Sequence, residues 1–458
     1  MIHSWPNAIM HCDADAFYVG CELARRPELR DKPVVVAGKL GSCILAKSYD
    51  LKRAGVKTAM PTWEVKKKHP EITILEADFQ YYSEVSAQMF SVLGKWTPDI
   101  EVYSIDEAFM DMKGFRKLYK MSYPKIAYAI KEEVKNHLGL TVSIGVSVNK
   151  TLAKMAAEVN KPDGVTSVSW RDIPSWLQKF KIEDVPGIGR NTTPMLNKLG
   201  VHTCADFTNL TFDTVKRILH KPGLQLWKEL QGEKVFRVEK TFAPNKMITR
   251  TSSFTPLTDH QGFLWSHTLR QLERAIEAMN DSHQMTREVT LYIRDKEFKR
   301  YHNTFRLPNS TRSFQVLVEV LKKLWKKHFP KGVLIRSTGI ILTHLSQNTG
   351  SQLNLFEDPG LIIRKDQLEE SKQGIKDRYG NLSIRSASSL RLKNLGPDRK
   401  KAIRAKTFNV DWGGAIQIFF CKAGIFIWEA NIADNQPLSS NIFNQQKNPP
   451  RGIGILVD

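Results

Sequence analysis

Cysteine is scarce in this chain of 458 residues, and none of its five cysteines belongs to a CxxC pair. Scattered cysteines are typical of reduced thiols, so we expect neither a disulfide framework nor a zinc site. The chain also lacks an apolar run of about 18 residues, and its N-terminus has no basic region followed by an apolar signal stretch. The sequence therefore predicts a globular cytoplasmic protein with no membrane partner.

Acidic residues are few relative to basic ones. The chain holds 68 lysines and arginines against 47 aspartates and glutamates, a net charge of +21. The excess is uneven, because residues 1–110 hold 13 basic and 15 acidic residues whereas residues 246–347 hold 17 and 8. A polyanionic partner is expected, with a merely solubilising surface as the alternative. The uneven charge predicts that the polyanion is bound in one part of the chain and that any catalytic site lies in another.

Short apolar segments alternate with helical patterns in the first 160 residues. Ile126, Ile130, Val134 and Leu138 recur every four residues and predict one amphipathic helix, and a second helix is expected at 151–159. This alternation predicts an α/β layer in which helices pack on one face of a mixed sheet. The predicted strands are 9–13, 34–37, 72–75, 100–105, 108–112 and 141–148.

The strand signal disappears between residues 165 and 230, where short helices are expected around DVPGIGRNT at 184–192. A polar, basic stretch at 232–247 has the composition of a linker. Beyond it, two amphipathic helices containing Leu272 and Leu321, with strands at 287–294 and 333–343, predict a second small α/β domain. After Gln347 the pattern weakens, and the tail is expected to be partly disordered.

Two adjacent carboxylates, Asp106 and Glu107, interrupt the β-type run VYSIDEAFMDM at 102–112. Successive side chains of a regular strand point to opposite faces, so the pair acts together only at a bend between two strands. Asp13 ends another predicted strand, and converging strand ends would gather three acids. Oxygen ligands suit Mg²⁺, and a pair of such ions would support phosphoryl transfer. Ordinary surface acids are the alternative.

Four segments resemble the Y-family DNA polymerases of the translesion type, closest to the bacterial polymerase IV and UmuC-like branch. They are HCDADAFYVGCE (11–22), YSIDEAFMD (103–111), SIGVSVNKTLAKMAAEVNKPDG (143–164) and DVPGIG (184–189), and the likeness in order and spacing covers residues 8–345. It implies a right-hand polymerase of the α/β (α+β) class, with a ferredoxin-like palm, small fingers, a helical helix-hairpin-helix thumb and a separate α/β little finger. The implied divisions are palm and fingers at 1–165 (fingers at 20–78), thumb at 166–232, linker at 233–247, little finger at 248–346 and tail at 347–458.

The resemblance assigns the catalytic metal site. Asp13, Asp106 and Glu107 are the implied ligands, joined by the backbone carbonyl of Ala14, and they would hold two Mg²⁺ ions. Glu107 would lie nearer the primer 3′-hydroxyl. Asp15 is expected to point away from the ions into a structural hydrogen bond.

Two aromatic residues, Phe17 and Tyr18, follow the first acid at the expected start of a helix. Free backbone N–H groups at a helix start favour phosphate oxygens, so both residues are assigned to the nucleotide site. Tyr18 resembles the family's steric gate, a ring that leaves no room for a 2′-hydroxyl and so selects deoxynucleotides.

Further nucleotide ligands are implied at Tyr49, Lys52 and Lys161, which match the family's triphosphate-binding positions. The sequence departs from the family at Lys52, where a point charge replaces the bidentate guanidinium of an arginine. The neighbouring Arg53 is the alternative ligand.

DNA contacts are expected in two places. In the thumb, Gly187 and Gly189 of the PGIG turn permit tight backbone angles and let N–H groups approach a DNA phosphate. In the little finger, basic side chains would contact the phosphate backbone without reading bases, which gives salt-sensitive binding. Arg294 and Arg300 are assigned to this role, among Arg287, Lys296, Lys299 and Arg306.

The segment QLNLF at 352–356 resembles the bacterial sliding-clamp-binding pentapeptide. In that motif an extended segment places apolar anchors in a pocket, here Leu353, Leu355 and Phe356, and Gln352 adds hydrogen bonds. A short element packing on its own domain is the alternative.

The expected function is template-directed addition of deoxynucleotides to a primer 3′-hydroxyl, at low fidelity and without proofreading. The partners are primer-template DNA, deoxynucleoside triphosphates and a sliding clamp, and the protein is expected to act as a nucleoid-associated monomer. Two alternatives remain open: a nucleotide cyclase, which would not need the PGIG turn or the basic domain, and a non-catalytic DNA-repair scaffold, which would not need the acids.

Overall fold

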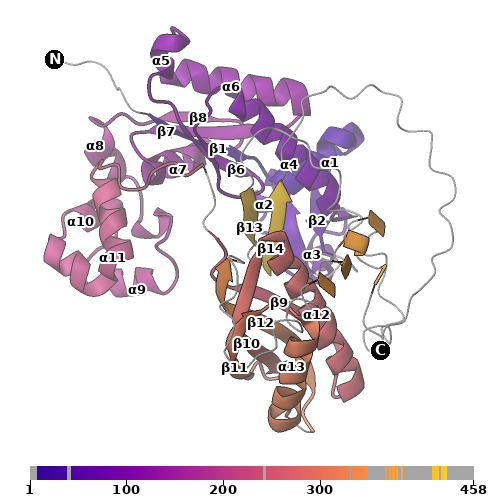
Figure 1. Cartoon of the computed structure of the whole chain (residues 1–458). Helices are drawn as coiled ribbons and strands as arrows, with labels where there is room; N and C mark the ends of the chain where they lie inside the picture. The colour runs from indigo at the N-terminus through magenta and orange to yellow at the C-terminus, as the bar shows by residue number, and fades with distance from the viewer. Residues whose placement is uncertain are drawn as a thin grey trace. The chain divides into compact units, whose positions relative to one another are not determined.

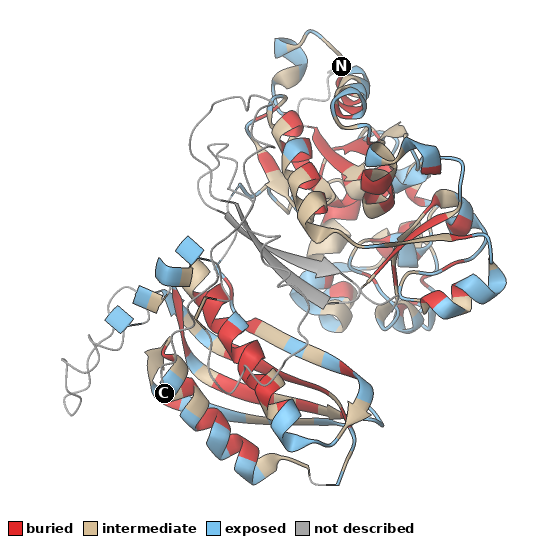
Figure 2. Ribbon diagram, turned by 90° about the vertical axis from the view of Figure 1, so that its right-hand side faces the viewer, coloured by how far each residue is buried: buried red, intermediate tan, exposed pale blue. Residues whose placement is uncertain are grey.

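The computed structural model of the chain describes residues 8–38, 43–240, 244–330 and 332–347, with short stretches within 367–384 and two strands at 415–421 and 424–430. Residues up to 240 form one compact unit, and residues 244–347 belong to a second (Figure 1). Buried side chains gather between the helices and sheets of each unit (Figure 2). None of the described helices is long and apolar enough to cross a membrane.

A five-stranded mixed sheet forms the centre of the first unit. Its order is β5 (Ile100–Val102), β6 (Glu107–Asp111), β1 (Ile9–Ala14), β7 (Val142–Ser147) and β8 (Val165–Ser167). The middle strand β1 pairs antiparallel with both β6 and β7, and β8 joins β7 in parallel. Nearly all residues of β1 and β7 are buried, including the polar residues His11, Ser143 and Ser147, so both faces of these strands are covered.

Helices cover both faces of this sheet, which corrects the expectation that they lie on one. Helix α6 (Tyr123–Leu138) carries the predicted buried stripe and lies on the opposite side of the sheet from α7 (Lys150–Val159) (Figure 1). The approach of α7 requires glycine at 145, where a Cβ would lie 2.0 Å from the carbonyl oxygen of Ala153. His11 is paired with Gly145 in register, so it shares the face that α7 covers.

A smaller three-stranded sheet follows β1 in the chain. Its order is β3 (Ile44–Lys47), β2 (Val34–Ala37) and β4 (Thr73–Glu76). Its apolar core includes Val35, Ile44 and Val65. The helical elements of this region are α1 (Phe17–Arg25), η1 (Pro27–Leu29), α2 (Tyr49–Arg53) and α3 (Thr62–Lys68), and the next helix is α4 (Phe79–Gly94).

Helices occupy residues 173–230, as the loss of strand signal predicted, and all but the last of them are short. They are α8 (Ile173–Leu177), η3 (Ile182–Asp184), α9 (Thr192–Asn197), α10 (Cys204–Thr208) and α11 (Phe212–Leu230). Their core is continuous with α7, because Leu152, Met155 and Ala156 pack among the buried residues of these helices. The small helix α5 (Phe115–Leu118) lies elsewhere, between β6 and α6.

The segment 233–240, expected as the start of a linker, is bound to the first unit. The fully buried Glu229 accepts hydrogen bonds from the backbone N–H groups of Thr151 at 2.9 Å, Val235 at 3.1 Å and Phe236 at 2.8 Å. Lys234 forms an ion pair with Asp111 at 2.8 Å. A single carboxylate thus joins α7 to the chain that follows α11.

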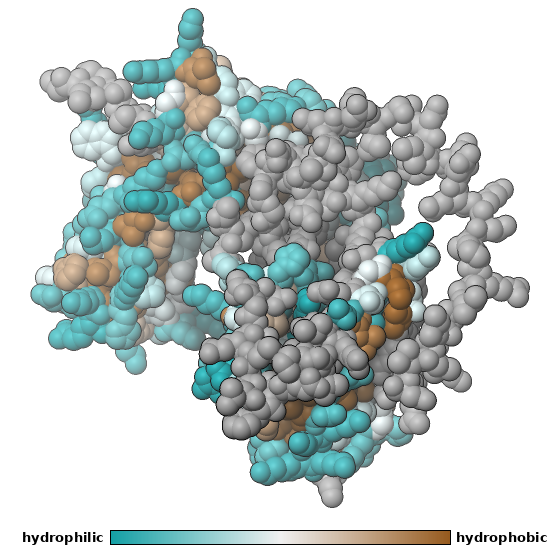
Figure 3. All heavy atoms as spheres, viewed as in Figure 1, coloured by the Kyte–Doolittle hydropathy of each residue, from teal (hydrophilic) through white to brown (hydrophobic). Residues whose placement is uncertain are grey.

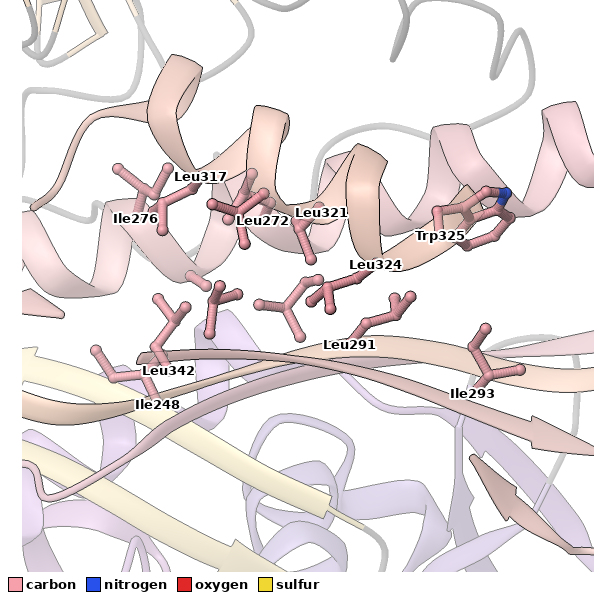
Figure 4. Close-up of a cluster of buried hydrophobic side chains, with 14 of the residues drawn as sticks. Ile248, Leu272, Ile276, Leu291, Ile293, Leu317, Leu321, Leu324, Trp325 and Leu342 are labelled. Atoms are coloured by element: carbon pink, nitrogen blue, oxygen red, sulfur yellow. The ribbon is translucent and has the colours of Figure 1, made fainter. Parts of the chain in front are cut away.

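The second unit is a four-stranded antiparallel sheet with two helices on one face (Figure 4). The strands lie in the order β11 (Arg300–Thr311), β10 (Gln284–Asp295), β12 (Ile335–Gln347) and β9 (Ile248–Thr258), and the helices are α12 (Gln261–Asp281) and α13 (Phe314–His328). Leu272 and Leu321 from the helices meet Leu291 and Leu342 from the sheet. The sequence predicted both helices and parts of β10 and β12, but missed β9 and β11.

Two strands lie near the end of the described chain. Residues 415–421 (β13) and 424–430 (β14) pair as a two-stranded sheet.

Candidate active site

The end of β1 and the start of β6 bring the predicted acids together. Asp13 stands directly opposite Glu107 in the strand register. The next residue, Ala14, donates its N–H to the carbonyl of Asp106 at 2.8 Å. Asp106 lies in the turn before β6, so a bend separates the two neighbouring acids.

The group that could hold a metal ion contains a residue that the sequence reasoning missed. Ligand atoms of His11, Asp13 and Glu107 lie within 4.8 Å of one another, and this is the one such group among the described residues. Asp106 is not a member of this group, and its carboxylate accepts a hydrogen bond from the Ser104 hydroxyl. The position of His11 two residues before Asp13, on the same face of one strand, is the signal that could have revealed it.

Lysines from α7 and the segment after it face these acids. Lys161 places its Nζ 2.7 Å from Asp13, and Lys154 forms an ion pair with Glu107. One helical turn before Lys154, Lys150 pairs with Glu101 at 2.7 Å. Ammonium groups therefore neutralise the cluster from the α7 side.

Burial and neighbouring charges together set the pKa values of the cluster. Burial raises the pKa of Asp13 to about 7, with Lys161 opposing the rise, and it also raises the pKa of Asp106. Burial acts on Glu107 in the same direction, but the hydrogen bond from His11 and the charge of Lys154 outweigh it, and the pKa falls to about 2. Burial lowers the pKa of His11 to about 4, so a neutral imidazole donates from Nε2 to Glu107 across 2.9 Å.

Asp15 has a different environment from Asp13. Its carboxylate accepts hydrogen bonds from the Ser143 hydroxyl at 2.8 Å, the Tyr49 hydroxyl at 3.2 Å and the backbone N–H of Asp163 at 2.8 Å. These donors occupy both carboxylate oxygens. Asp15 therefore fixes the positions of Tyr49 and of the loop that carries Lys161.

The expected gate residue lies in the first turn of α1. Phe17 and Tyr18 open this helix, whose preceding residue, Ala16, is left-handed with φ of 45°. The first backbone N–H groups of a helix have no acceptor within it. These N–H groups lie shortly after Asp13, near the end of β1. Phe17 is buried, whereas Tyr18 is half-buried and stacks against Tyr82.

The structure distinguishes the two candidate cations on α2. Arg53 is exposed and forms an ion pair with Asp50 of its own helix. Lys52 instead lies over the ring of Tyr49, with its Nζ 5.2 Å from the ring centroid, and makes no ion pair within the described part of the chain. Lys52 is therefore the cation that lies beside Tyr49 and is available for an anion.

The PGIG turn has the backbone that its glycines predict. It links η3 to α9, and Gly187 has a φ of +99°, which strains any other L residue. Gly187 and Gly189 are exposed, and nothing lies within 4 Å of where a Cβ at Gly189 would be. The backbone at this turn is open to a ligand.

Arg294 and Arg300 lie opposite each other on neighbouring strands of the second unit. Side chains alternate along a strand, and the neighbouring Ile293 points into the core, so the two arginines lie on the face away from α12 and α13. Arg294 and Arg336 both stack on the exposed ring of Phe298, at 4.6 Å and 4.4 Å. Nothing in the sequence indicated that Arg336 shares the ring of Phe298 with Arg294.

Hydrophilic side chains make up most of the described surface in Figure 3, with smaller hydrophobic areas between them. The predicted clamp-binding residues Gln352, Leu353, Leu355 and Phe356 lie outside the described residues.

Comparison with known proteins identifies the family. The sequence profile of the impB/mucB/samB family matches residues 12–158, its C-terminal domain matches 245–355, and the DNA polymerase-iota thumb domain matches 183–233. DNA polymerase IV of Alkaliphilus oremlandii is 30% identical over 390 residues, which cover 82% of this chain and 97% of that protein. The chain belongs to the Y-family of DNA polymerases. DNA polymerase IV of Desulfatibacillum aliphaticivorans is also 30% identical, over 83% of this chain and 96% of its own.

Solved structures of Y-family polymerases have the same fold. A chimera of Dbh and Dpo4 matches with a TM-score of 0.63 at 24% identity, covering 74% of this chain and 100% of its own. An insertion ternary complex of Dbh DNA polymerase matches with a TM-score of 0.53 at 23% identity, with the same coverage. The expected right-hand fold of the α/β (α+β) class is thereby confirmed.

Proposed function

We propose that this Y-family member is a template-directed DNA polymerase of the translesion type, which extends a primer 3′-hydroxyl. The observation that carries the proposal is the pairing of Asp13 with Glu107 across β1 and β6, with Asp106 held beside them by the Ala14 N–H. A cyclase would have no use for the open PGIG backbone or the arginine face of the second unit. A scaffold would not need buried acids that must be neutralised by lysines.

The donor set suits a hard divalent cation. Carboxylate oxygens from Asp13 and Glu107 converge within 4.8 Å, and the Ala14 carbonyl and Asp106 lie next to them in the chain. These residues would hold Mg²⁺, which would favour loss of the proton from the primer 3′-hydroxyl and would neutralise charge on the leaving pyrophosphate. His11 orients Glu107 through its Nε2–H. We propose two ions for the complete site.

The incoming nucleotide is assigned to the residues around the start of α1 and α2. Tyr49 and Lys52 would bind the triphosphate, and Arg53 is the weaker candidate because Asp50 already pairs with it. Lys161 would leave Asp13 and turn to a phosphate. Tyr18 would exclude the 2′-hydroxyl of a ribonucleotide.

The domain assignment follows the same reasoning. Residues 1–165 would be palm and fingers, 166–232 the thumb, 248–346 the little finger and 347–458 the tail. Gly187 and Gly189 would bind one DNA phosphate through backbone N–H groups, and Arg294 and Arg300 would bind others. We place the protein in the cytoplasm, on the nucleoid.

Primer extension with Mg²⁺ tests the function. The intact chain should extend a primer on undamaged and abasic templates, whereas Asp106→Ala should lose activity. Glu132→Ala is a matched control, because Glu132 is an exposed acid on α6, on the far side of the sheet. Template-independent product, or full activity in Asp106→Ala, would contradict the proposal.

We also propose that residues 352–356 bind a sliding clamp, and a separate experiment tests this contact. Sliding clamp should retain the intact chain in a pulldown and lose it when Leu355 and Phe356 are changed to alanine. Primer extension without clamp should be unaffected by the same change. Equal retention of both proteins would argue against the assignment.

A further inference from the structure

The ring of Tyr18 is backed by a second aromatic ring. Tyr18 and Tyr82 are stacked, with ring centroids 4.8 Å apart and planes 21° from parallel. Phe79 contacts the same ring edge-on at 5.8 Å. Tyr18 lies in the first turn of α1, Tyr82 and Phe79 lie in the first turn of α4, and the two helices are side by side (Figure 1).

The buried carboxylate of Glu22 holds Tyr82 in place. The Tyr82 side chain is fully buried, and its hydroxyl donates a hydrogen bond to Oε1 of Glu22 at 2.7 Å. Burial raises the pKa of Tyr82, so the phenol keeps its proton and remains a donor. The Glu22 side chain is also fully buried. A hydrogen bond to a charged, buried acceptor is stronger than one between neutral groups, so the Tyr82 ring has little freedom.

Two arginines neutralise Glu22. Arg25 and Arg26 approach its carboxylate at 2.7 Å and 3.0 Å. Arg25 also pairs with Asp78, the N-cap of α4, at 3.0 Å, and its guanidinium lies 4.3 Å from the ring centroid of Tyr81. These contacts lock the start of α4 onto α1, and they place a continuous set of fixed groups behind the gate ring.

We propose that Tyr82, held by Glu22, is the positioning residue that fixes Tyr18 and so determines how strongly the enzyme rejects ribonucleotides. The proposal rests on the assignment of Tyr18 as the gate. A ring excludes a 2′-hydroxyl only if it cannot retreat by about the size of one oxygen atom, and close packing against Tyr82 prevents that movement. Tyr82 touches the gate and not the substrate, so its effect is on sugar selection rather than on catalysis.

Single-nucleotide insertion kinetics of the full chain test this role. The discrimination ratio is kcat/KM for a deoxynucleotide divided by kcat/KM for the matching ribonucleotide. Tyr18→Ala should lose most of this ratio. Tyr82→Leu should lose about three- to tenfold, the contribution of one aromatic contact, while kcat for the deoxynucleotide is retained. Tyr82→Phe keeps the ring and should lose less than Tyr82→Leu.

A double variant shows whether Tyr82 acts through the gate. If it does, Tyr18→Ala combined with Tyr82→Leu should have the ratio of Tyr18→Ala alone. Additive losses would overturn the positioning role. An unchanged ratio in Tyr82→Leu, with the loss still present in Tyr18→Ala, would overturn it and leave the gate intact. An unchanged ratio in Tyr18→Ala would overturn the gate itself.

Two further variants keep the proposal testable if Tyr82→Leu does not fold. Glu22→Gln faces the arginines with an amide and should lose about two- to threefold of the ratio, because one charge-assisted contact is weakened. If Tyr82→Leu does not fold, an unchanged ratio in Glu22→Gln overturns the proposal. Tyr119→Phe is the control, since it removes a phenol hydrogen bond of 2.8 Å to the Trp96 carbonyl. Its ratio should equal that of the unaltered protein.

Discussion

Two groups of buried carboxylates in the first unit differ in the donors that satisfy them. Glu229 is fully buried and accepts three backbone N–H groups. Asp13 and Glu107 keep side-chain exposures of 15% and 13%, and their partners include the ammonium groups of Lys161 and Lys154. The first arrangement cannot change without breaking the backbone structure, whereas the second can exchange a lysine for another cation.

This difference in donors separates the acids assigned to catalysis, here called the reactive acids, from Glu229 better than burial does. A carboxylate bound to fixed N–H groups acts as a joint between segments, because its charge is matched by groups that cannot leave. A lysine has a flexible four-carbon stem and can move its charge by several bonds. We therefore propose that Asp13 and Glu107, which face lysines, are open to a metal ion.

The largest expected effect is on catalysis at the exchangeable acids. Asp13→Asn keeps the size of the side chain but removes its charge, so primer extension should fall by about 10³-fold or more. Stability should change little, because Lys161 keeps its contact with Glu158 at 2.5 Å. Steady-state primer extension and thermal unfolding measure the two quantities.

Glu132→Gln serves as the control for that change, since it removes one exposed carboxylate from the opposite side of the same sheet. Its activity should match that of the unaltered chain. A variant at Asp13 that unfolds at much lower temperature, yet retains activity while folded, would reverse the distinction between the two groups.

Glu229→Ala should have the opposite pattern. The change leaves three backbone N–H groups in a buried site without their acceptor, and we expect the free energy of unfolding of the first unit to fall by about 3 kcal/mol. Urea unfolding followed by hydrogen exchange in α7 and α11 would measure this loss. Activity per folded molecule should be retained.

Glu233→Ala is the matched control, because Glu233 is exposed in the same segment and its pair with Lys228, at 3.3 Å, lies on the surface. Glu233→Ala should lower the free energy of unfolding by less than about 1 kcal/mol. Equal losses of unfolding free energy in Glu229→Ala and Glu233→Ala would show that the buried Glu229 carboxylate has no special role in stability.

The parts of the fold that were predictable are those with strong periodicity. The stripe Ile126, Ile130 and Val134 predicted α6, and the apolar runs predicted β1 and β7. Strands β9 and β11 were missed because many of their residues are exposed and polar, which a sequence pattern shares with loops. The alternation of strands and helices also does not say which face of a sheet a helix will cover, so the expectation that the helices lie on one face was wrong.

The site was predictable to the extent that it depends on neighbours in the chain. The bend between Asp106 and Glu107 followed from strand alternation. The contact of Lys154 with Glu107 depends on the side of the sheet that α7 covers, and the bond from Tyr82 to Glu22 joins residues 60 positions apart. Such partners are fixed by tertiary packing, and no local pattern indicates them.

Lys52 and Arg53 of α2 differ in the same way as the two groups of acids, because Arg53 already has a charged partner and Lys52 makes no ion pair within the described residues. This difference predicts which of them binds the nucleotide. Lys52→Met should raise KM for the deoxynucleotide about tenfold, since it removes a charge that can reach a phosphate. Arg53→Met should change KM by less than about twofold, because this guanidinium already pairs with Asp50 on the surface. Single-turnover titrations with nucleotide measure both. A larger effect at Arg53 would assign the triphosphate to Arg53 instead.

Asp15 lies between the two classes, and its substitution has the smallest expected effect. Like Glu229, Asp15 accepts a hydrogen bond from the backbone, in this case from one N–H group. It also accepts a hydrogen bond from the hydroxyl of Tyr49, whose ring is assigned to the nucleotide. Asp15→Asn would replace one of the two acceptor oxygens with an NH2 group, which would face a donor on that side, so the position of Tyr49 should be less fixed. We expect KM for the deoxynucleotide to rise about three-fold and kcat to stay within about twofold, because the loss of one hydrogen bond affects binding rather than the metal site. Ser143→Ala removes another donor to the same carboxylate and should leave KM unchanged, so a fall in kcat for Asp15→Asn alone would place Asp15 with Asp13 among the reactive acids.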